Sequence, residues 1–147
     1  MSGKEALFEL LKQQQQATRG VDWAKNREEW NHAVEDLINN IDAWLEPVKE
    51  LRVEKISVNL NEEYLGSYSI IGRIIKAPNG IQVTIKPIAR NIIGGLGRVD
   101  LESLPRKAML ILREKGKWVF PGRAMAGISE TPLTEDAFLG KLCELLA

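Results

Sequence analysis

The sequence of 147 residues contains one cysteine and one histidine. Cys143 cannot form an internal disulfide bond, which fits a reducing compartment. We expect it to be an inert, partly buried thiol on a helix rather than a nucleophile. His32 has no second ligand residue in a spacing typical of a metal site, so we expect no metal centre and no cofactor.

Long hydrophobic runs are also missing. No apolar segment approaches the ~18 residues that a membrane-spanning helix needs. The N-terminus lacks the apolar core and the small-residue cleavage site of a secretory signal. We therefore expect a cytoplasmic protein with no membrane contact.

A net charge is absent as well, because 20 basic residues balance 20 acidic residues. This balance excludes a global field that attracts nucleic acid or membrane surfaces. The charges are unevenly distributed, with six basic and ten acidic residues in 1–50 but nine basic and three acidic residues in 86–123. Either these layers complement each other inside the fold, or the basic segment faces an anionic partner.

No catalytic motif is present: the serines lack the Gly-x-Ser-x-Gly setting of a nucleophile elbow. Four carboxylates could serve acid–base chemistry only if two of them shared one site: Glu62, Glu63, Asp100 and Glu102. We expect Asp100 to be solvated, and Glu62 or its neighbour to form a surface salt bridge with Arg73 or Arg98. We assign no catalytic residue, and an enzyme is not our preferred interpretation.

Residues 1–50 predict two helices. Ser2 and Glu5 have the spacing of a capping box, and Arg19-Gly20 is a plausible end of the first helix. Asp22 is a candidate N-cap for the second helix, which ends at or before Pro47. Each helix carries an apolar stripe: Leu7, Leu10 and Leu11 on the first, and Trp30, Val34, Leu37, Ile38, Ile41, Trp44 and Leu45 on the second.

The spacing of the apolar residues changes after residue 51, where they begin to alternate with polar residues. Strands are expected at 56–60, 64–76, 81–87, 99–101, 109–112 and 118–120, and residues 123–130 are expected to form a loop. The Pro78-Asn79-Gly80 sequence predicts a hairpin turn. Gly66 and Gly72 indicate bulges, curvature or close approach of another group inside a strand.

The last segment predicts a third helix that begins after Thr131-Pro132 or at Thr134. The expected fold is one α+β domain covering residues 1–147. Residues 1–50 form two helices, residues 51–122 form a curved antiparallel meander of five or six strands, and residues 131–147 form the C-terminal helix. Helices and strands are segregated along the chain, which argues against a parallel βαβ arrangement.

A glycine-rich bend is the strongest candidate ligand site. Gly94, Gly95 and Gly97 allow backbone amides to converge on an anion, and Arg90 and Arg98 flank them. The aromatic ring of Tyr68 or of Tyr64 is a candidate for the pocket wall. The bend lacks the Gly-Lys-Ser/Thr ending of a P-loop, and a strand rather than a helix is expected after it. The alternative interpretation is a strand connection that needs positive φ angles.

A second candidate surface is the basic segment around the last two expected strands. Its cations alternate with two aromatic residues, a pattern that can bind single-stranded nucleic acid: Arg106, Lys107, Arg113, Lys115, Lys117 and Arg123, with Trp118 and Phe120. The two rings share one strand face, however, and we expect that face to belong to the core. Nucleic acid is therefore not an expected partner.

The preferred hypothesis is a small, non-enzymatic protein-binding module: an adaptor, an inhibitor or immunity-type protein, or a subunit that self-assembles. Four tryptophans, an acidic helical segment and a basic strand segment favour contact with a protein partner or with further copies. The alternatives are an anion- or small-ligand-binding protein, or an enzyme, with its site at Gly94–Arg98, and a nucleic-acid-binding protein that uses residues 106–123.

Overall fold

The computed structural model describes residues 2–19, 23–62, 66–89, 96–124 and 127–147. Two helices come first, α1 (Gly3–Arg19) and α2 (Trp23–Leu45). Seven strands follow: β1 (Arg52–Glu62), β2 (Gly66–Lys76), β3 (Gln82–Ala89), β4 (Gly97–Ser103), β5 (Arg106–Arg113), β6 (Lys117–Ala124) and β7 (Gly127–Pro132). A 3₁₀ turn (Glu114–Gly116) joins β5 to β6, and α3 (Glu135–Leu146) is the last helix.

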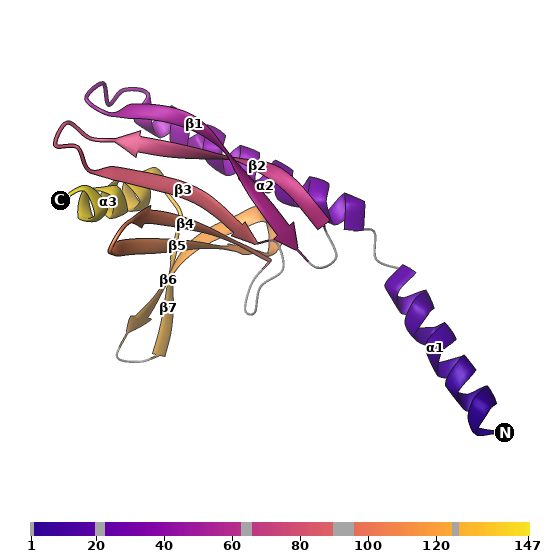
Figure 1. The fold of residues 1–147 in the computed structure, drawn as a ribbon. Helices are drawn as coiled ribbons and strands as arrows, with labels where there is room; N and C mark the ends of the chain where they lie inside the picture. Colours follow the sequence, from indigo (N-terminus) through magenta and orange to yellow (C-terminus); the bar gives the residue numbers. More distant parts are fainter. Residues whose placement is uncertain (1, 20–22, 63–65, 90–95, 125–126) are drawn as a thin grey trace.

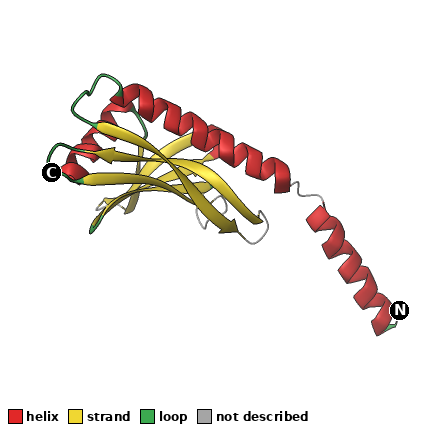
Figure 2. Cartoon of the chain, turned by 45° about the horizontal axis from the view of Figure 1, so that its top comes forward, coloured by secondary structure: helices red, strands yellow, loops and turns green. Residues whose placement is uncertain are grey.

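The strands form one antiparallel sheet in chain order, from β1 to β7. The predicted α+β fold with an antiparallel meander is confirmed, although the sheet has seven strands instead of five or six. The curved sheet carries α2 along one face, with α3 beside it, while α1 extends away from the body of the molecule (Figures 1 and 2). None of the described helices is both long and apolar enough to cross a membrane.

The helix ends follow the predicted signals. The Ser2 hydroxyl accepts a hydrogen bond from the Glu5 amide at 3.2 Å, which is one half of the expected capping box. The first helix ends at Arg19, and α2 ends two residues before Pro47. Thr134 is the N-cap of α3, and its side chain accepts from the Ala137 amide at 3.1 Å. The proposed N-cap Asp22 lies outside the described residues.

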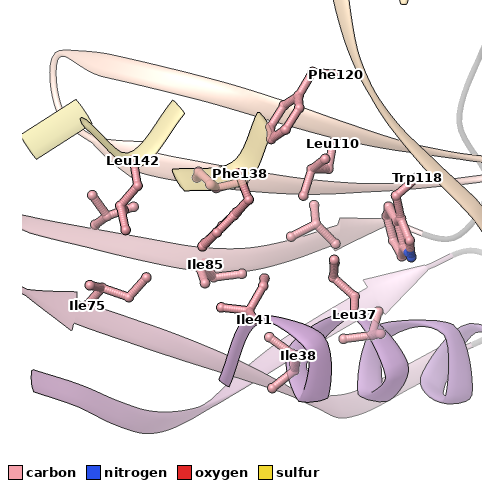
Figure 3. Close-up of a cluster of buried hydrophobic side chains, with 14 of the residues drawn as sticks. Leu37, Ile38, Ile41, Ile75, Ile85, Leu110, Trp118, Phe120, Phe138 and Leu142 are labelled. Atoms are coloured by element: carbon pink, nitrogen blue, oxygen red, sulfur yellow. The ribbon is translucent and has the colours of Figure 1, made fainter. Parts of the chain in front are cut away.

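The core lies between the sheet and the two helices that cover it. Figure 3 shows Ile38 and Ile41 of α2 and Phe138 of α3 meeting Ile85 and Leu110 of the sheet. The predicted apolar stripe of α2 is buried as expected, apart from Trp44, which is partly buried and packs on the Phe138 ring at 5.6 Å between centroids. Burial of apolar surface contributes roughly 25 cal/mol per Å², so this face provides the main driving force for folding.

The predicted hairpin turn is confirmed. The Ala77 carbonyl accepts from the Gly80 amide at 3.0 Å, and the Asn79 side-chain oxygen accepts from the Ile81 amide at 3.0 Å. Gly80 has a φ of 87°, a region that residues with a β-carbon avoid. At the far end of the return strand the register shifts between Pro87 and Ala89, as expected for a proline within a strand.

The close approach predicted at Gly72 is present. A β-carbon at this position would stand 2.6 Å from the Ile85 carbonyl oxygen on β3. Hydrogen-bonded pairing between β2 and β3 covers only residues 73–76 and 82–85. Ile70 and Ile75 are both buried in the core although they are five residues apart, a spacing that places side chains on opposite faces of a regular strand. Strand β2 therefore changes the face that it turns to the core near Gly72, while its register with β1 continues without a shift.

The described residues of the expected loop at 123–130 lie in two strands instead. Strand β6 continues past Pro121-Gly122 to Ala124, and Gly127–Pro132 returns as β7, paired with β6 from Val119 to Ala124. Apart from Ile128, the residues of Gly127–Glu130 are small or polar and show little apolar alternation, so the period-2 signal was too weak to reveal the strand. Strand β7 is held by its backbone pairing with β6, which the side-chain pattern does not predict.

Candidate functional site

The N-terminal helix carries an apolar surface that the rest of the chain does not cover. Leu7, Phe8, Leu10 and Leu11 are 55%, 62%, 50% and 49% exposed. All residues from 2 to 13 are exposed. Their spacing places the four side chains on one broad side of α1, which we call the α1 stripe. Large apolar side chains gathered on one exposed surface mark an interaction site, whereas single ones are ordinary.

The charges on α1 are mixed. Lys4 and Lys12 balance Glu5 and Glu9 around the stripe, and Arg19 at the end of the helix gives α1 a net charge of +1. The Lys4 ammonium lies 6.0 Å from the centroid of the Phe8 ring, a cation–π distance. Amphipathic helices that lie on membranes are usually rich in lysine and arginine on the polar face, which this helix is not. The composition of α1 favours a protein surface as its counterpart.

The predicted ligand bend is only partly described. Arg90, Gly94, Gly95 and Tyr64 lie outside the described residues, whereas Gly97 and Arg98 begin β4. Gly97 faces the core, where a β-carbon would stand 2.5 Å from Cζ3 of Trp30. Successive residues of a strand point to opposite faces, so Arg98 points away from α2. Tyr68 packs against the core, and the contacts described for Arg98 and Tyr68 involve different partners.

Arg98 is held in an ion cluster on the outer face of β4. Its Nε and Nη2 atoms donate to the two Asp100 carboxylate oxygens at 2.7 and 3.0 Å. The Lys107 ammonium lies 2.9 Å from the same carboxylate and 3.8 Å from that of Glu102. The hydrogen bond with Asp100 raises the pKa of Arg98, and burial opposes this rise. The Arg98 guanidinium therefore serves as a structural partner of the Asp100 carboxylate.

Asp100 differs from the expectation of a solvated carboxylate. It is 1% exposed, although it lies on the sheet face away from the helices. Its Cα partners are Lys86 on β3 and Met109 on β5, and the long side chains around it exclude water. Because a buried carboxylate needs partners, the cations of this basic segment serve at least partly to compensate Asp100.

Tyr68 lines a cavity of about 300 Å³ together with residues of β1 and β2. Its hydroxyl donates a hydrogen bond to the Glu62 carboxylate. Burial raises the pKa of Tyr68, the Glu62 carboxylate raises it further, and the Trp30 indole and Arg27 act in the opposite direction. The indole N–H lies near the phenol but makes no hydrogen bond of ordinary geometry within the described residues.

Arg98, one of the two arginines expected to pair with Glu62 or Glu63, bonds to Asp100, and Glu63 lies outside the described residues. Arg73, 6% exposed, bonds instead to Asp42 of α2, with donor–acceptor distances of 3.2 and 3.0 Å. This pair joins the helix to the sheet across the layer boundary. Pairing Arg73 with a residue 31 positions away depends on packing, which sequence spacing does not reveal.

The other polar candidates, His32 and Cys143, have exposed side chains. His32 lies 3.7 Å from Glu35, and both side chains are exposed. Cys143 is exposed instead of partly buried. Over the part of the chain that the structure describes, no three His, Cys, Asp or Glu side chains gather into a group that could hold a metal ion.

The basic segment does not present its aromatic rings to solvent. Trp118 and Phe120 are 8% and 5% exposed and belong to the core, as expected from their shared strand face. The Trp118 ring packs on Trp30 at 6.1 Å between centroids. Arg113 forms an ion pair with Glu130 of β7. Base stacking on these rings would require opening the core.

Comparison of the chain with models of known protein families, with curated proteins and with solved structures finds no match.

Proposed function

We propose that the chain is a non-enzymatic protein-binding module and that α1 is its main contact element. The observation that supports the proposal is the exposure of the α1 stripe, in which each of four large apolar side chains is about half exposed or more. Leaving such a side chain in water forgoes about 1.5–3 kcal/mol of burial free energy. A partner groove that covers the stripe recovers this free energy.

The mode of recognition that fits is an amphipathic helix lying in an apolar groove. Such helices are anchored by side chains at positions i, i+3, i+4 and i+7, and Leu7, Leu10 and Leu11 match the first three. Phe8 widens the apolar surface on one side. The groove belongs either to another protein or to a further copy of this chain, and the absence of net charge in the sequence offers no repulsion against either.

The test compares the wild type with Leu7→Glu/Leu11→Glu, which places two carboxylates in the stripe. Both proteins are used as bait in a lysate of the source organism, and their masses are measured by light scattering after size-exclusion chromatography. We expect the wild type either to capture one protein from the lysate or to have the mass of a dimer. The variant should lose that captured protein or that dimer. Circular dichroism checks that the sheet is unchanged.

A matched control is Lys12→Gln/Gln13→Glu, which changes the net charge of the same helix by the same amount outside the stripe. This variant should keep the partner. A wild-type chain that is monomeric and captures nothing, or a partner that tolerates both double variants equally, would refute the role of α1.

A further inference from the structure

Strands β5 and β6 are neighbours over only part of their length. Their pairing covers Ile111–Arg113 of β5 and Lys117–Val119 of β6. On their other sides, β5 pairs with β4 over residues 106–112 and β6 pairs with β7 over residues 119–124. Among the described residues, no pairing joins 106–110 to 120–124, and the β6–β7 hairpin runs away from β4 and β5 (Figure 1). The sheet is split at this point.

Among the described strands, the split leaves two edges without a paired strand, and α3 lies beside the opening. In an antiparallel strand, alternate residues direct their N–H and C=O groups to opposite sides, so about half of residues 106–110 direct theirs into the opening. On β6 the opening begins at Phe120, and the next residue, Pro121, has no N–H to donate. The β5 edge contains no proline, and is therefore the better template for an added strand.

A cavity of about 470 Å³ occupies the opening. Its wall comes from both diverging strands and from α3: Arg106, Lys107, Ala108, Met109, Phe120, Pro121, Lys141, Glu144 and Leu145. Cavities of roughly 300–1,000 Å³ commonly bind ligands in proteins. The cavity coincides with the unpaired edges, so a ligand there can contact side chains and backbone together.

The inner part of the cavity is apolar. Phe120 and Leu145 are 5% and 4% exposed and belong to the core, and Ala108 is a partly buried residue packed against the same core. These three side chains come from β6, α3 and β5. Together they form a wall against which one apolar side chain of a ligand can pack.

The rim of the cavity is cationic. Arg106, Lys107 and Lys141 outnumber the single carboxylate of Glu144 among the lining residues, a formal charge of +2, and Lys107 also pairs with Asp100 and Glu102. Nη1 of Arg106 donates to the carbonyls of Glu144 and Ala147 at 2.6 and 2.9 Å, and its remaining N–H groups make no bond with the described residues. The Lys141 ammonium lies 5.7 Å from the centroid of the Phe120 ring and 3.4 Å from Glu144.

We propose that this cleft binds an extended, acidic segment of a partner protein, which adds to β5 as an extra strand. The backbone edge of residues 106–110 supplies the main-chain hydrogen bonds, over about 16 Å at the usual rise of a strand. Apolar residues of the segment pack on Phe120, and its carboxylates meet the cations of the rim, of which Lys141 lies over the Phe120 ring. Leu104, 79% exposed in the turn before Arg106, offers an apolar contact at the wide end.

The cleft and the α1 stripe consist of different residues on different elements, so this inference does not depend on the role of α1. The test begins with random eight-residue peptides displayed on phage and selected on the full chain. In the enriched peptides, we expect apolar residues to alternate with Asp or Glu. The best peptide is synthesised, and its Kd is measured by fluorescence anisotropy with the wild type and with Lys141→Glu, for which we expect at least tenfold weaker binding.

Two controls separate strand addition from general attraction. The same peptide with alternate amides N-methylated keeps its charges but cannot pair with β5, and it should bind at least tenfold more weakly. Lys55→Glu makes the same charge change at an exposed position of β1 and should leave the Kd unchanged. Leu7→Glu/Leu11→Glu should also leave it unchanged, which distinguishes this site from α1.

Hydrogen exchange provides a readout that needs no variant. Bound peptide should slow exchange of backbone amides within residues 106–110 and should not protect α1. Selection that enriches no acidic sequences would overturn the proposal. So would equal affinity of the N-methylated peptide, an unchanged Kd in the Lys141 variant, or protection confined to another part of the chain.

Discussion

The indole ring of Trp30 lies directly against the backbone of Gly97. A β-carbon at Gly97 would stand 2.5 Å from Cζ3 of Trp30 and 3.0 Å from Cε3. The contact joins α2 to the first residue of β4, next to the glycine-rich bend. Because Trp30 is fully buried and packs on Trp118, its ring has little room to move.

Gly97→Ala should therefore destabilise the protein. Overpacking a filled core costs about 1–3 kcal/mol, and we expect a loss in this range in urea unfolding followed by tryptophan fluorescence. Gly140→Ala is the matched control, because nothing lies within 4 Å of the added methyl group in α3. In a helix this exchange should stabilise by about 0.5–1 kcal/mol. Equal effects of the two substitutions would contradict the close contact with Trp30.

Arg98→Ala tests whether this arginine acts as a structural partner. Asp100, 1% exposed, would lose two hydrogen bonds, and Lys107 would be its remaining ionic partner among the described residues. Hydrogen bonds to charged groups contribute about 1.5–3 kcal/mol, and we expect a loss of stability of this order. Arg52→Ala, at an exposed position of β1, should change stability by no more than about 0.5 kcal/mol. An Arg98 variant as stable as the wild type would free this residue for the ligand role that the sequence predicted.

Tyr68 should make the stability of the protein fall at alkaline pH. The folded state raises the pKa of its phenol through burial and through Glu62, whereas in the unfolded chain the phenol titrates at about 10. Below pH ~10 both states hold the proton, and this stabilising contribution is complete. As the pH rises above ~10, the unfolded state loses the proton first. The free energy of unfolding therefore decreases over the pH range between ~10 and the raised pKa of the folded state.

Tyr68→Phe should remove this part of the pH dependence. The measurement is urea unfolding at a series of pH values on either side of pH ~10, with the wild type and the variant side by side. Tyrosinate absorbance offers a second readout, since the sequence has two tyrosines and the variant retains one. Parallel stability curves for the two proteins through this range would show that the phenol does not keep its proton more tightly when folded.

The local signals in the sequence predicted most of the elements. The seven-residue stripe of α2 and the Pro-Asn-Gly turn led to the right helix and the right hairpin, because each depends on a few adjacent residues. Strand β7 was missed, since its order comes from pairing with β6 and its own residues show little alternation. At Gly72 the sequence allowed a bulge, curvature or close approach of another group, and only the packed sheet shows the close approach of the Ile85 carbonyl.

For the candidate sites too, the sequence revealed the residues but not their tertiary contacts. The sequence showed the leucines of α1, but it could not show that the folded body leaves them uncovered. It also showed the charges of Arg98, Asp100 and Arg73, but not their partners, because Asp42 is 31 residues from Arg73 and Asp100 is buried by side chains from three strands. The opening between β5 and β6 has no local signature, apart from Pro121 at its edge.

Taken alone, the amino-acid order was enough for the class of fold, the helix ends and the apolar faces, since these follow from period, capping and turn chemistry over a few residues. Tertiary packing decided which apolar surface remained exposed, which carboxylate each arginine met and where the sheet split. Those outcomes depend on contacts between residues far apart in the chain, and on a competition for burial that no local pattern records.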